Sequence, residues 1–530
     1  MDSGIITFGL KGASAYSVTA ETDVRNGLPY YEIIGQGSES VKESRKRVKS
    51  AVINSGFDFP KGHVTQNLSP GDVKKYGTLF DLPLALSILS EIRRKTSAAF
   101  PAENHKAVGV MGELSLDGRV LPVKGILPCM VCGRNSRVNH FIVPEDNYRQ
   151  AVLCPDIFVY PVRTLREAAE AFAMSLDLFE KTCGERLPVD SGQSRITKQT
   201  EGSKIPAPPE IPDLSDIVGQ EGAKRALLIA ACGNHNILMA GSPGCGKTML
   251  ATALRGILPE MTFEEYFEVL SLYDTFGLGD VIGESRERPF RIVHQGVTKH
   301  ALIGGGRPIE IGDISLAHNG VLFLDEISEM QRNIVEALRL PLEERKVYIN
   351  NCGIKEVLPA DFMLVAAANP CPCGNLYEKP GLCTCTSNMI KSYAAKLSGA
   401  IRDRIDIKIN MRSVEVKDIE KPKGACSKDV RETVKRVRGL QKLRFEDCSF
   451  KTNSGIPRAE SCECCRLSAS SREIINSAVE KFGLSIRGRE KTVKVARTIA
   501  DIEGHGLITD DDILEALQYR IVSDEKEGVF

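Results

Sequence analysis

The sequence predicts an α/β protein with several domains: a mixed α/β domain first, an α/β core built around a phosphate-binding loop next, and a helical lid last. Three observations predict this order. Strand and helix patterns alternate over roughly the first 180 residues, a glycine-rich loop joins a strand pattern to a helix pattern near the middle, and the pattern becomes helical from about Val414. A chain of 530 residues has room for about three or four domains.

The first domain is expected to cover residues 1–181. Its strand patterns lie at 5–8, 31–34 and 157–160, and its helix patterns lie at 41–54, 82–92 and 164–173. Asp117-Gly118 separates two apolar runs and predicts a tight hairpin turn, because both residues tolerate a positive φ. Alternating elements of this kind predict a mixed α/β domain.

Residues 182–212 are expected to form an extended linker, because Ser, Gln, Lys, Thr and Pro dominate there and build no core. The core is then expected to span 213–412 and the lid 413–530. In the lid, Val430, Val434, Val437 and Leu440 recur at helical spacing. A last helix is predicted to begin at Thr509, because three aspartates follow it and favour a helix N-terminus.

The composition leaves the class of partner open. Lysine plus arginine and aspartate plus glutamate both total 69, so any nucleic-acid surface must be local. The N-terminus carries no signal-peptide pattern, and no apolar run approaches the length of a membrane span. We therefore expect a cytoplasmic protein with no membrane partner. In that compartment the 16 cysteines are expected to be thiols or metal ligands rather than disulfides.

The most informative stretch is a glycine-rich loop with the spacing of a phosphate-binding loop. Its residues are Gly241, Ser242, Pro243, Gly244, Cys245, Gly246, Lys247 and Thr248. It follows an apolar strand pattern and precedes a helix pattern, so an ordinary glycine-rich turn is disfavoured. Backbone amides and the helix N-terminus would bind phosphate oxygens of ATP. Lys247 would reach the outer phosphates, and the Thr248 hydroxyl would bind Mg²⁺.

A second strand pattern, 321–324, ends in two acids, Asp325 and Glu326. A buried parallel strand places its last residues at the edge of the sheet where ligands bind. Asp325 would hold Mg²⁺ directly or through water, and Glu326 would polarise the water that attacks the terminal phosphate. Together with the phosphate-binding loop, this pair predicts ATP hydrolysis rather than ATP binding alone.

From the phosphate-binding loop to Asp406 the chain resembles the magnesium-chelatase-like branch of the AAA+ ATPases, and its whole length resembles the YifB/ComM group of that branch. Besides the loop, the segments that carry this resemblance are 301–306, 314–326, 369–374, 403–406 and 496–501. The resemblance implies a Lon-protease-like N-terminal domain with an S5 domain 2-like fold, a P-loop AAA+ core, and a lid of the magnesium-chelatase C-terminal type.

The resemblance also implies a homo-oligomeric ring, expected to be a hexamer, with ATP bound between neighbouring subunits. Asn369 matches sensor one, which orients the attacking water. Arg404 matches the arginine finger, which stabilises transition-state charge in the next subunit. The alternative for Arg404 is a salt bridge with Asp403 or Asp406. In the lid, Arg487 matches sensor two, with Arg489 and Arg497 as competing candidates.

The Lon-like domain departs from the pattern of a working protease. A serine nucleophile and a lysine base would be required, but no serine occupies the expected position within 75–82, and Cys129 takes the usual place of the lysine. We therefore expect no protease activity, and a role in assembly or in substrate contact.

Two groups of cysteines stand out. Cys371, Cys373, Cys383 and Cys385 form two C-x-C pairs that bracket a nine-residue loop and could hold a tetrahedral Zn²⁺. The alternative is four reduced cysteines in a surface loop. The second group, Cys462, Cys464 and Cys465 with Cys448 upstream, fits no metal-binding spacing and is interpreted as unrelated thiols.

Two elements are expected, from the resemblance, to face the pore of the ring. One is an insert over 290–307 with Lys299, and the other is a hairpin with Lys346 and Lys355. Cationic side chains there suit DNA phosphates, although ordinary solvated charges are the alternative. The leading hypothesis is a DNA-translocating ring, a branch-migration helicase of recombination or natural transformation. A magnesium-chelatase-like motor subunit and a protein-remodelling or regulatory ATPase are the alternatives, and porphyrin-chelatase partners are not expected.

Overall fold

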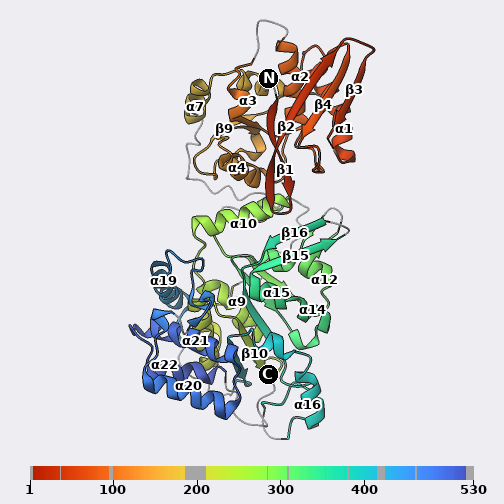
Figure 1. The fold of residues 1–530 in the computed structure, drawn as a ribbon. Coiled ribbons are helices and arrows are strands. Elements are labelled where there is room, and N and C mark those ends of the chain that lie inside the picture. The colour runs from red at the N-terminus through yellow and green to blue at the C-terminus, as the bar shows by residue number, and fades with distance from the viewer. Residues whose placement is uncertain are drawn as a thin grey trace. The chain divides into compact units, whose positions relative to one another are not determined.

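The computed structural model describes residues 4–35, 37–94, 100–185, 211–282, 285–306, 309–351, 354–378, 381–414, 424–459 and 462–520. The chain divides into two compact units (Figure 1). One contains Met1–Ile205 and Tyr266–Glu284, and the other contains Pro206–Glu265 and Ser285–Phe530. Most of the expected linker, residues 186–210, lies outside the described residues.

The N-terminal unit contains a seven-stranded mixed sheet in the order β3-β4-β2-β1-β5-β8-β9. Its strands are β1 (Ile5–Lys11), β2 (Ser14–Arg25), β3 (Tyr30–Ile34), β4 (His63–Ser69), β5 (Val108–Val110), β8 (His140–Pro144) and β9 (Phe158–Val162). β1 and β2 pair antiparallel, whereas β1, β5, β8 and β9 run parallel. The sheet confirms the predicted mixed α/β character of this part of the chain.

Seven helices of the N-terminal half accompany this sheet. They are α1 (Glu39–Asn54), α2 (Asp81–Arg94), α3 (Asn104–Ala107), α4 (Ile126–Asn135), α5 (Tyr148–Ala151), α6 (Leu165–Phe172) and α7 (Leu176–Glu185). The predicted hairpin also forms, between β6 (Glu113–Leu114) and β7 (Val120–Leu121). Its turn is longer than predicted: Ser115 donates its amide to Arg119, and Gly118 (φ 86°) takes the left-handed position.

The N-terminal unit includes a segment from the middle of the chain. This segment carries most of α10 (Phe263–Thr275) and α11 (Gly279–Ile282), which the predicted boundaries assigned to the ATPase core. Asp274, nearly fully buried, accepts the amide of Leu127 on its carboxylate at 3.0 Å and the amide of Gly125 on its carbonyl at 3.1 Å. Those amides belong to the N-terminus of α4, where a negative charge stabilises the helix.

The second unit is built on a five-stranded sheet in the order β11-β14-β17-β10-β18. Its strands are β10 (Ile237–Gly241), β11 (Phe290–Val293), β14 (Val321–Leu324), β17 (Met363–Ala368) and β18 (Ile407–Met411). Every pairing in this sheet is parallel. β10, β14 and β17 are buried along their whole length, as expected of parallel strands that are covered on both faces.

One sequence expectation for this unit is wrong over its first four residues, and the rest of it stays a prediction. Residues 290–307 were predicted to form an insert facing a pore, but Phe290–Val293 is the edge strand β11 and pairs with β14. Arg291 in this strand forms a 2.6 Å ion pair with Asp313. After β11 the chain forms the short helix α12 (Lys299–Ile303) and a small ribbon of β12 (Gly304–Gly305) and β13 (Glu310–Ile311).

The remaining elements of the core are mostly short helices. They are α8 (Glu221–Gly233), α9 (Lys247–Ile257), α13 (Asp313–Leu316), α14 (Arg332–Ala337), α15 (Arg339–Glu344), α16 (Ser387–Ala394) and α17 (Gly399–Arg402). β15 (Lys346–Asn351) and β16 (Ile354–Pro359) form the predicted antiparallel hairpin.

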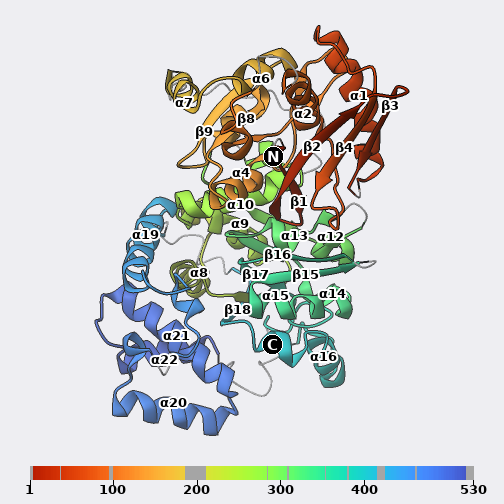
Figure 2. The same cartoon turned by 45° about the horizontal axis from the view of Figure 1, so that its top comes forward.

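The C-terminal part is helical, as predicted. Its helices are α19 (Ser427–Arg444), α20 (Ala469–Phe482), α21 (Ile486–Glu503) and α22 (Asp510–Gln518). α19 contacts α8 and α9, α21 contacts α8, and α22 packs against α20 and α21 (Figures 1 and 2). Val434 and Val437 are fully buried in a cluster that includes core residues of α9, but Leu440, predicted on the same face, is exposed. Thr509 caps α22 as predicted, in a reciprocal capping box with Asp512. Within the described ranges, no helix combines the length and the apolar character that crossing a bilayer requires.

Candidate active site

The parallel sheet brings three separate segments to one edge. Ala240 of β10 is in register with Ala368 of β17, and Leu324 of β14 is in register with Ala366. Because parallel strands end at the same edge, the loop after β10, the acids after β14 and Asn369 after β17 must lie close together.

The loop after β10 has the backbone of a phosphate-binding loop. Gly244 (φ 79°) and Gly246 (φ 96°) both occupy the left-handed region, which a side chain would strain. Lys247 then begins α9 directly after Gly246. The predicted strand, loop and helix therefore follow one another, with a helix N-terminus beside the loop, where anions are favoured.

Lys247 folds back over this loop. Its Nζ donates to the carbonyls of Gly241 at 2.6 Å and Ser242 at 3.0 Å, and to Asn369 Oδ1 at 3.2 Å. Burial lowers the pKa of Lys247, although the nearby thiol of Cys245 and the carboxylate of Asp325 oppose this shift. The ammonium group is thus held where the loop meets the end of β17.

Asp325 and Thr248 face each other across the same edge. Thr248 Oγ1 donates to Asp325 Oδ2 at 3.4 Å, and Asp325 Oδ1 accepts the amide of Glu326 at 3.1 Å. A hydroxyl and a carboxylate so placed fit the oxygen ligands that Mg²⁺ takes. Glu326 is exposed and has a left-handed backbone (φ 52°), which is uncommon for a residue with a side chain.

One contact to the loop was missed in the sequence. Gln220, just before α8, donates its side-chain amide to the carbonyl of Cys245 at 3.2 Å and to the carbonyl of Arg412 at 2.6 Å. It thereby ties the phosphate-binding loop to the end of β18. No pattern in the sequence indicates this role, because the partners are main-chain atoms distant along the chain.

Arg404 and Arg487 meet on one carboxylate that sequence reasoning also missed. Arg404 Nη2 and Arg487 Nη2 bind the two oxygens of Glu343, the latter at 2.8 Å. Arg404 is nearly buried, whereas the side chain of Arg487 is about half exposed. Among the described residues, the acidic partner of Arg404 is therefore Glu343, and not Asp403 or Asp406.

This pair lies at the opposite edge of the sheet from the phosphate-binding loop. Ile407, three residues after Arg404, is in register with Ile237, the first residue of β10. The five residues of β10 span roughly 16 Å at about 3.3 Å per residue. The structure therefore brings Lys247, Thr248, Asp325, Glu326 and Asn369 to one edge and leaves Arg404 and Arg487 at the other.

The competing lid arginines differ in their surroundings. Arg497 is fully buried and donates to Asp501 Oδ1 at 2.9 Å and to the carbonyl of His505 at 2.7 Å. Its bonds stay within the lid, which favours a structural role. Arg487 stands at the first turn of α21, where its head group can be reached.

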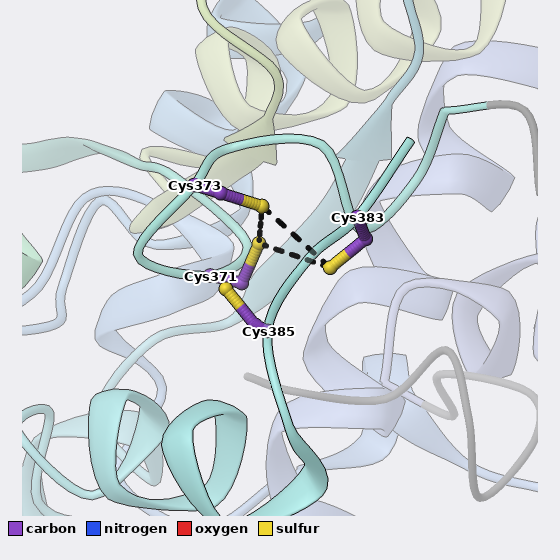
Figure 3. A group of neighbouring side chains, drawn as sticks. All are labelled: Cys371, Cys373, Cys383 and Cys385. Atoms are coloured by element: carbon purple, nitrogen blue, oxygen red, sulfur yellow. Dashed lines mark hydrogen bonds between the residues drawn. The ribbon is translucent and has the colours of Figure 1, made fainter. Parts of the chain in front are cut away.

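The four cysteines predicted as a metal site lie together (Figure 3). Their sulfur atoms all fall within 4.8 Å of one another, and Cys371 is fully buried. The second group also gathers three thiols, Cys462, Cys464 and Cys465, within the same limit.

The lysines predicted to contact DNA are all exposed. Asn350 pairs with Lys355 and Lys346 pairs with Pro359, so Lys346 and Lys355 share one face of the hairpin with Tyr348. Val347 and Ile349 are buried on the opposite face. Lys299 lies elsewhere, in the first turn of α12.

Comparison with known proteins agrees with this architecture. The family model "Magnesium chelatase, subunit ChlI" matches residues 213–419, "Subunit ChlI of Mg-chelatase" matches 20–147, and "Magnesium chelatase, subunit ChlI C-terminal" matches 424–520. These matches define a magnesium-chelatase-like AAA+ ATPase, a family that implies ATPase activity.

Several relatives align over almost the whole chain. Competence protein ComM of Haemophilus influenzae is 36% identical over 513 residues, covering 96% of this chain and 95% of that protein. YifB of Escherichia coli K12 is 34% identical over 517 residues, with 96% and 95% covered. The chain belongs to the YifB/ComM group of this family. The magnesium-chelatase 67 kDa subunit of Chlorobaculum parvum is 30% identical, but over only 29% of this chain and 23% of that protein.

Proposed function

We propose that this protein is a ring-forming ATPase that hydrolyses ATP at the edge formed by β10, β14 and β17. The observation that carries this proposal is the convergence of Lys247, Thr248, Asp325 and Asn369 from three strands of one parallel sheet. Two left-handed glycines and a helix N-terminus complete a cradle for phosphate groups.

Each residue at this edge has a role that its position supports. Lys247 binds the outer phosphates, and Thr248 and Asp325 hold Mg²⁺, which neutralises charge on those phosphates. Glu326, exposed beside Asp325, polarises the attacking water, and Asn369 orients that water. These assignments follow the family pattern and fit the hydrogen bonds already described.

Arg404 and Arg487 serve a neighbouring subunit in this proposal. They lie at the amino end of the sheet, about one strand length from their own phosphate-binding loop, so they cannot act on their own nucleotide in this arrangement. A ring solves this, because each subunit offers its pair of guanidinium groups to the next site. Glu343 holds both arginines in position until then.

DNA is the substrate that the observations favour. The hairpin of β15 and β16 places Lys346 and Lys355 on one exposed face beside Tyr348, a combination of cation and aromatic ring that suits a nucleic-acid backbone and its bases. A relative that aligns over nearly the whole chain is a competence protein. We therefore infer a translocase that promotes branch migration in recombination or natural transformation, working as a hexamer.

The N-terminal domain has no protease activity in this proposal. Cys129, which stands where the lysine base is expected, is buried in α4, and burial raises the pKa of its thiol. Leu79, in the segment where a nucleophilic serine is expected, is also buried. The domain is left with roles in assembly or substrate contact.

One experiment separates this function from its rivals. ATP hydrolysis is measured with and without forked or four-way-junction DNA, using Lys247→Ala and Glu326→Gln as inactive controls. Stimulation by DNA together with strand exchange is the expected result. An ATPase indifferent to DNA that responds to a porphyrin-binding partner would establish the magnesium-chelatase-like motor, which all three family matches keep as the second candidate.

A further inference from the structure

The cluster of Cys371, Cys373, Cys383 and Cys385 has the dimensions of a tetrahedral metal site. Zn–S bonds of about 2.3 Å place the sulfurs of a tetrahedral Zn²⁺ site about 3.8 Å apart. Here Cys371 and Cys373 are 3.4 Å apart, Cys371 and Cys383 are 3.8 Å apart, and Cys373 and Cys383 are 3.6 Å apart. Figure 3 shows the sulfurs of Cys371, Cys373 and Cys383 facing one another, with that of Cys385 beside them.

Main-chain groups around the cluster hold two of its sulfurs in place. Main-chain groups of Asn375 and Thr384 hydrogen-bond the sulfur of Cys373, and that of Leu376 hydrogen-bonds Cys371. Such bonds from outside the metal's own ligands fix the orientation of the ligands and are a common part of built metal sites. Four thiolates without oxygen or nitrogen ligands select Zn²⁺ or iron rather than Mg²⁺.

We propose that Cys371, Cys373, Cys383 and Cys385 hold one Zn²⁺, and that the occupied site supports the phosphate-binding loop. The zinc site does not depend on the proposed nucleotide site, whereas the support of the loop rests on it.

The segment that carries the first two cysteines contacts the phosphate-binding loop directly. Cys371 follows Asn369 by two residues, and Gly374 (φ 80°) packs against Pro243 of the phosphate-binding loop so closely that an added Cβ would lie 2.6 Å from Pro243 Cδ. Farther on, Glu378 Oε1 accepts the amide of Ser413 at 3.2 Å and its hydroxyl at 2.5 Å. The segment from Cys371 to Glu378 therefore braces one side of the loop against the end of β18.

The second cysteine group provides a matched control. Cys462 and Cys464 are 2.9 Å apart, closer than two ligands of one tetrahedral Zn²⁺ can be, and the group has three thiols within the described residues. It also lies in the lid, between α19 and α20. Removing two thiols there changes the cysteine count equally but should leave the metal in place.

Metal content of the full-length protein tests the first part. Elemental analysis should find one zinc per chain in the wild type and in Cys462→Ser/Cys464→Ser, and close to none in Cys383→Ser/Cys385→Ser. Protein that carries no zinc after growth and purification with zinc present would overturn the site, as would iron and its visible absorption in place of zinc.

Titration with a fluorescent ATP analogue tests the second part. Removing zinc from the wild type with a chelator should weaken binding about tenfold or more, and returning zinc should restore it. Because the same chain is used before and after, misfolding of a variant cannot mimic the result. Gly374→Ala should keep its zinc yet bind the analogue more weakly, because its Cβ meets Pro243.

The outcomes separate the two proposals. Zinc-loaded wild type that binds no nucleotide would contradict the nucleotide site and leave the zinc site standing. Zinc-free protein that binds the analogue with undiminished affinity would end the proposed support of the loop.

Discussion

Lys247 Nζ and Asn369 Oδ1 lie 3.2 Å apart, so the phosphate-binding loop and the end of β17 are joined by a hydrogen bond. This contact holds the two groups side by side at the edge of the sheet where the loop after β10 meets the end of β17. Substitutions at different residues of this edge should therefore separate an effect on ATP binding from an effect on ATP hydrolysis.

Lys247→Ala and Glu326→Gln should therefore fail in different ways. Losing the ammonium group removes affinity for the phosphates, so Lys247→Ala should neither bind nor hydrolyse ATP. Glu326→Gln keeps the cradle and should bind ATP normally, while hydrolysis falls by about 10²–10⁴-fold, as for loss of a group that activates water. Titration with a fluorescent ATP analogue and phosphate release measure the two effects. Normal binding by Lys247→Ala would contradict the site.

Arg404→Ala should abolish ATP hydrolysis, and mixing it with a second inactive variant should restore part of the activity. Loss of an arginine finger costs about 10³-fold or more. When Arg404→Ala and Lys247→Ala are mixed in equal amounts before assembly, some interfaces pair an intact loop with an intact arginine. Phosphate release should recover to about a quarter of the wild-type rate, by random assembly of a ring.

A mixture of Lys247→Ala with Glu326→Gln is the control for this recovery. Both changes lie in the same subunit's half of the site, so no interface regains a complete set and the mixture should stay inactive. Equal recovery in both mixtures, or none in either, would rule out the assignment of Arg404 to a neighbouring site.

Lys346→Ala/Lys355→Ala should weaken DNA binding and reduce its dependence on salt. Each phosphate contact contributes about 0.9 to the slope of log affinity against log salt, so the slope should decrease by about 2. Fluorescence anisotropy with a four-way junction at several salt concentrations measures this. Lys428→Ala/Lys481→Ala removes two exposed lysines of the lid and should leave the slope unchanged. Identical slopes for the wild type and the hairpin variant would show that Lys346 and Lys355 do not contact DNA phosphates.

Lowering the pH should destabilise the packing of the lid against the core, because His235 becomes protonated. This residue is fully buried, and its Nε2 lies 2.8 Å from Thr498 Oγ1 of α21. Burial lowers the pKa of His235 from 6.5 to about 4, although the carboxylate of Asp406 opposes the shift. The unfolded chain therefore binds the proton more readily, so the stabilisation is complete above pH 6.5 and is lost as the pH falls toward 4. The full loss amounts to about 3 kcal/mol.

Thermal unfolding across this pH range tests the role of His235. Between pH 6.5 and 4, the melting temperature of the wild type should fall further than that of His235→Gln, because glutamine at position 235 does not titrate. Parallel curves for the two proteins would exclude His235 as the source of the pH dependence.

The sequence predicted which residues meet at one edge of the parallel sheet, because its signals are local. A glycine loop between a strand and a helix, and an apolar run that ends in two acids, each carry their meaning within about ten residues, and the parallel sheet does the rest. The expectation failed at Phe290–Val293, where an edge strand is only partly buried and lacks the continuous apolar run of β14 and β17.

Contacts between distant residues escaped prediction for the opposite reason. Glu343 is 61 positions from Arg404 and 144 from Arg487, and nothing in its surroundings along the chain indicates that it binds two arginines. Gln220 similarly reaches carbonyl groups 25 and 192 positions away. The cysteines were easier, because two C-x-C pairs close together already imply one cluster.

The return of the chain into the N-terminal unit at Tyr266–Glu284 limits how the protein can be divided. Cutting between 186 and 210 breaks the covalent link to the first half, but residues 266–284 still belong to the N-terminal unit and bind it through non-covalent contacts, so the two pieces should stay together after proteolysis there. A fragment that starts at residue 211 would keep Asp274 but lose the amides of Gly125 and Leu127 that its buried carboxylate and carbonyl accept. Such a fragment should be prone to aggregation, whereas deleting 266–284 together with the first half would yield a better-behaved motor.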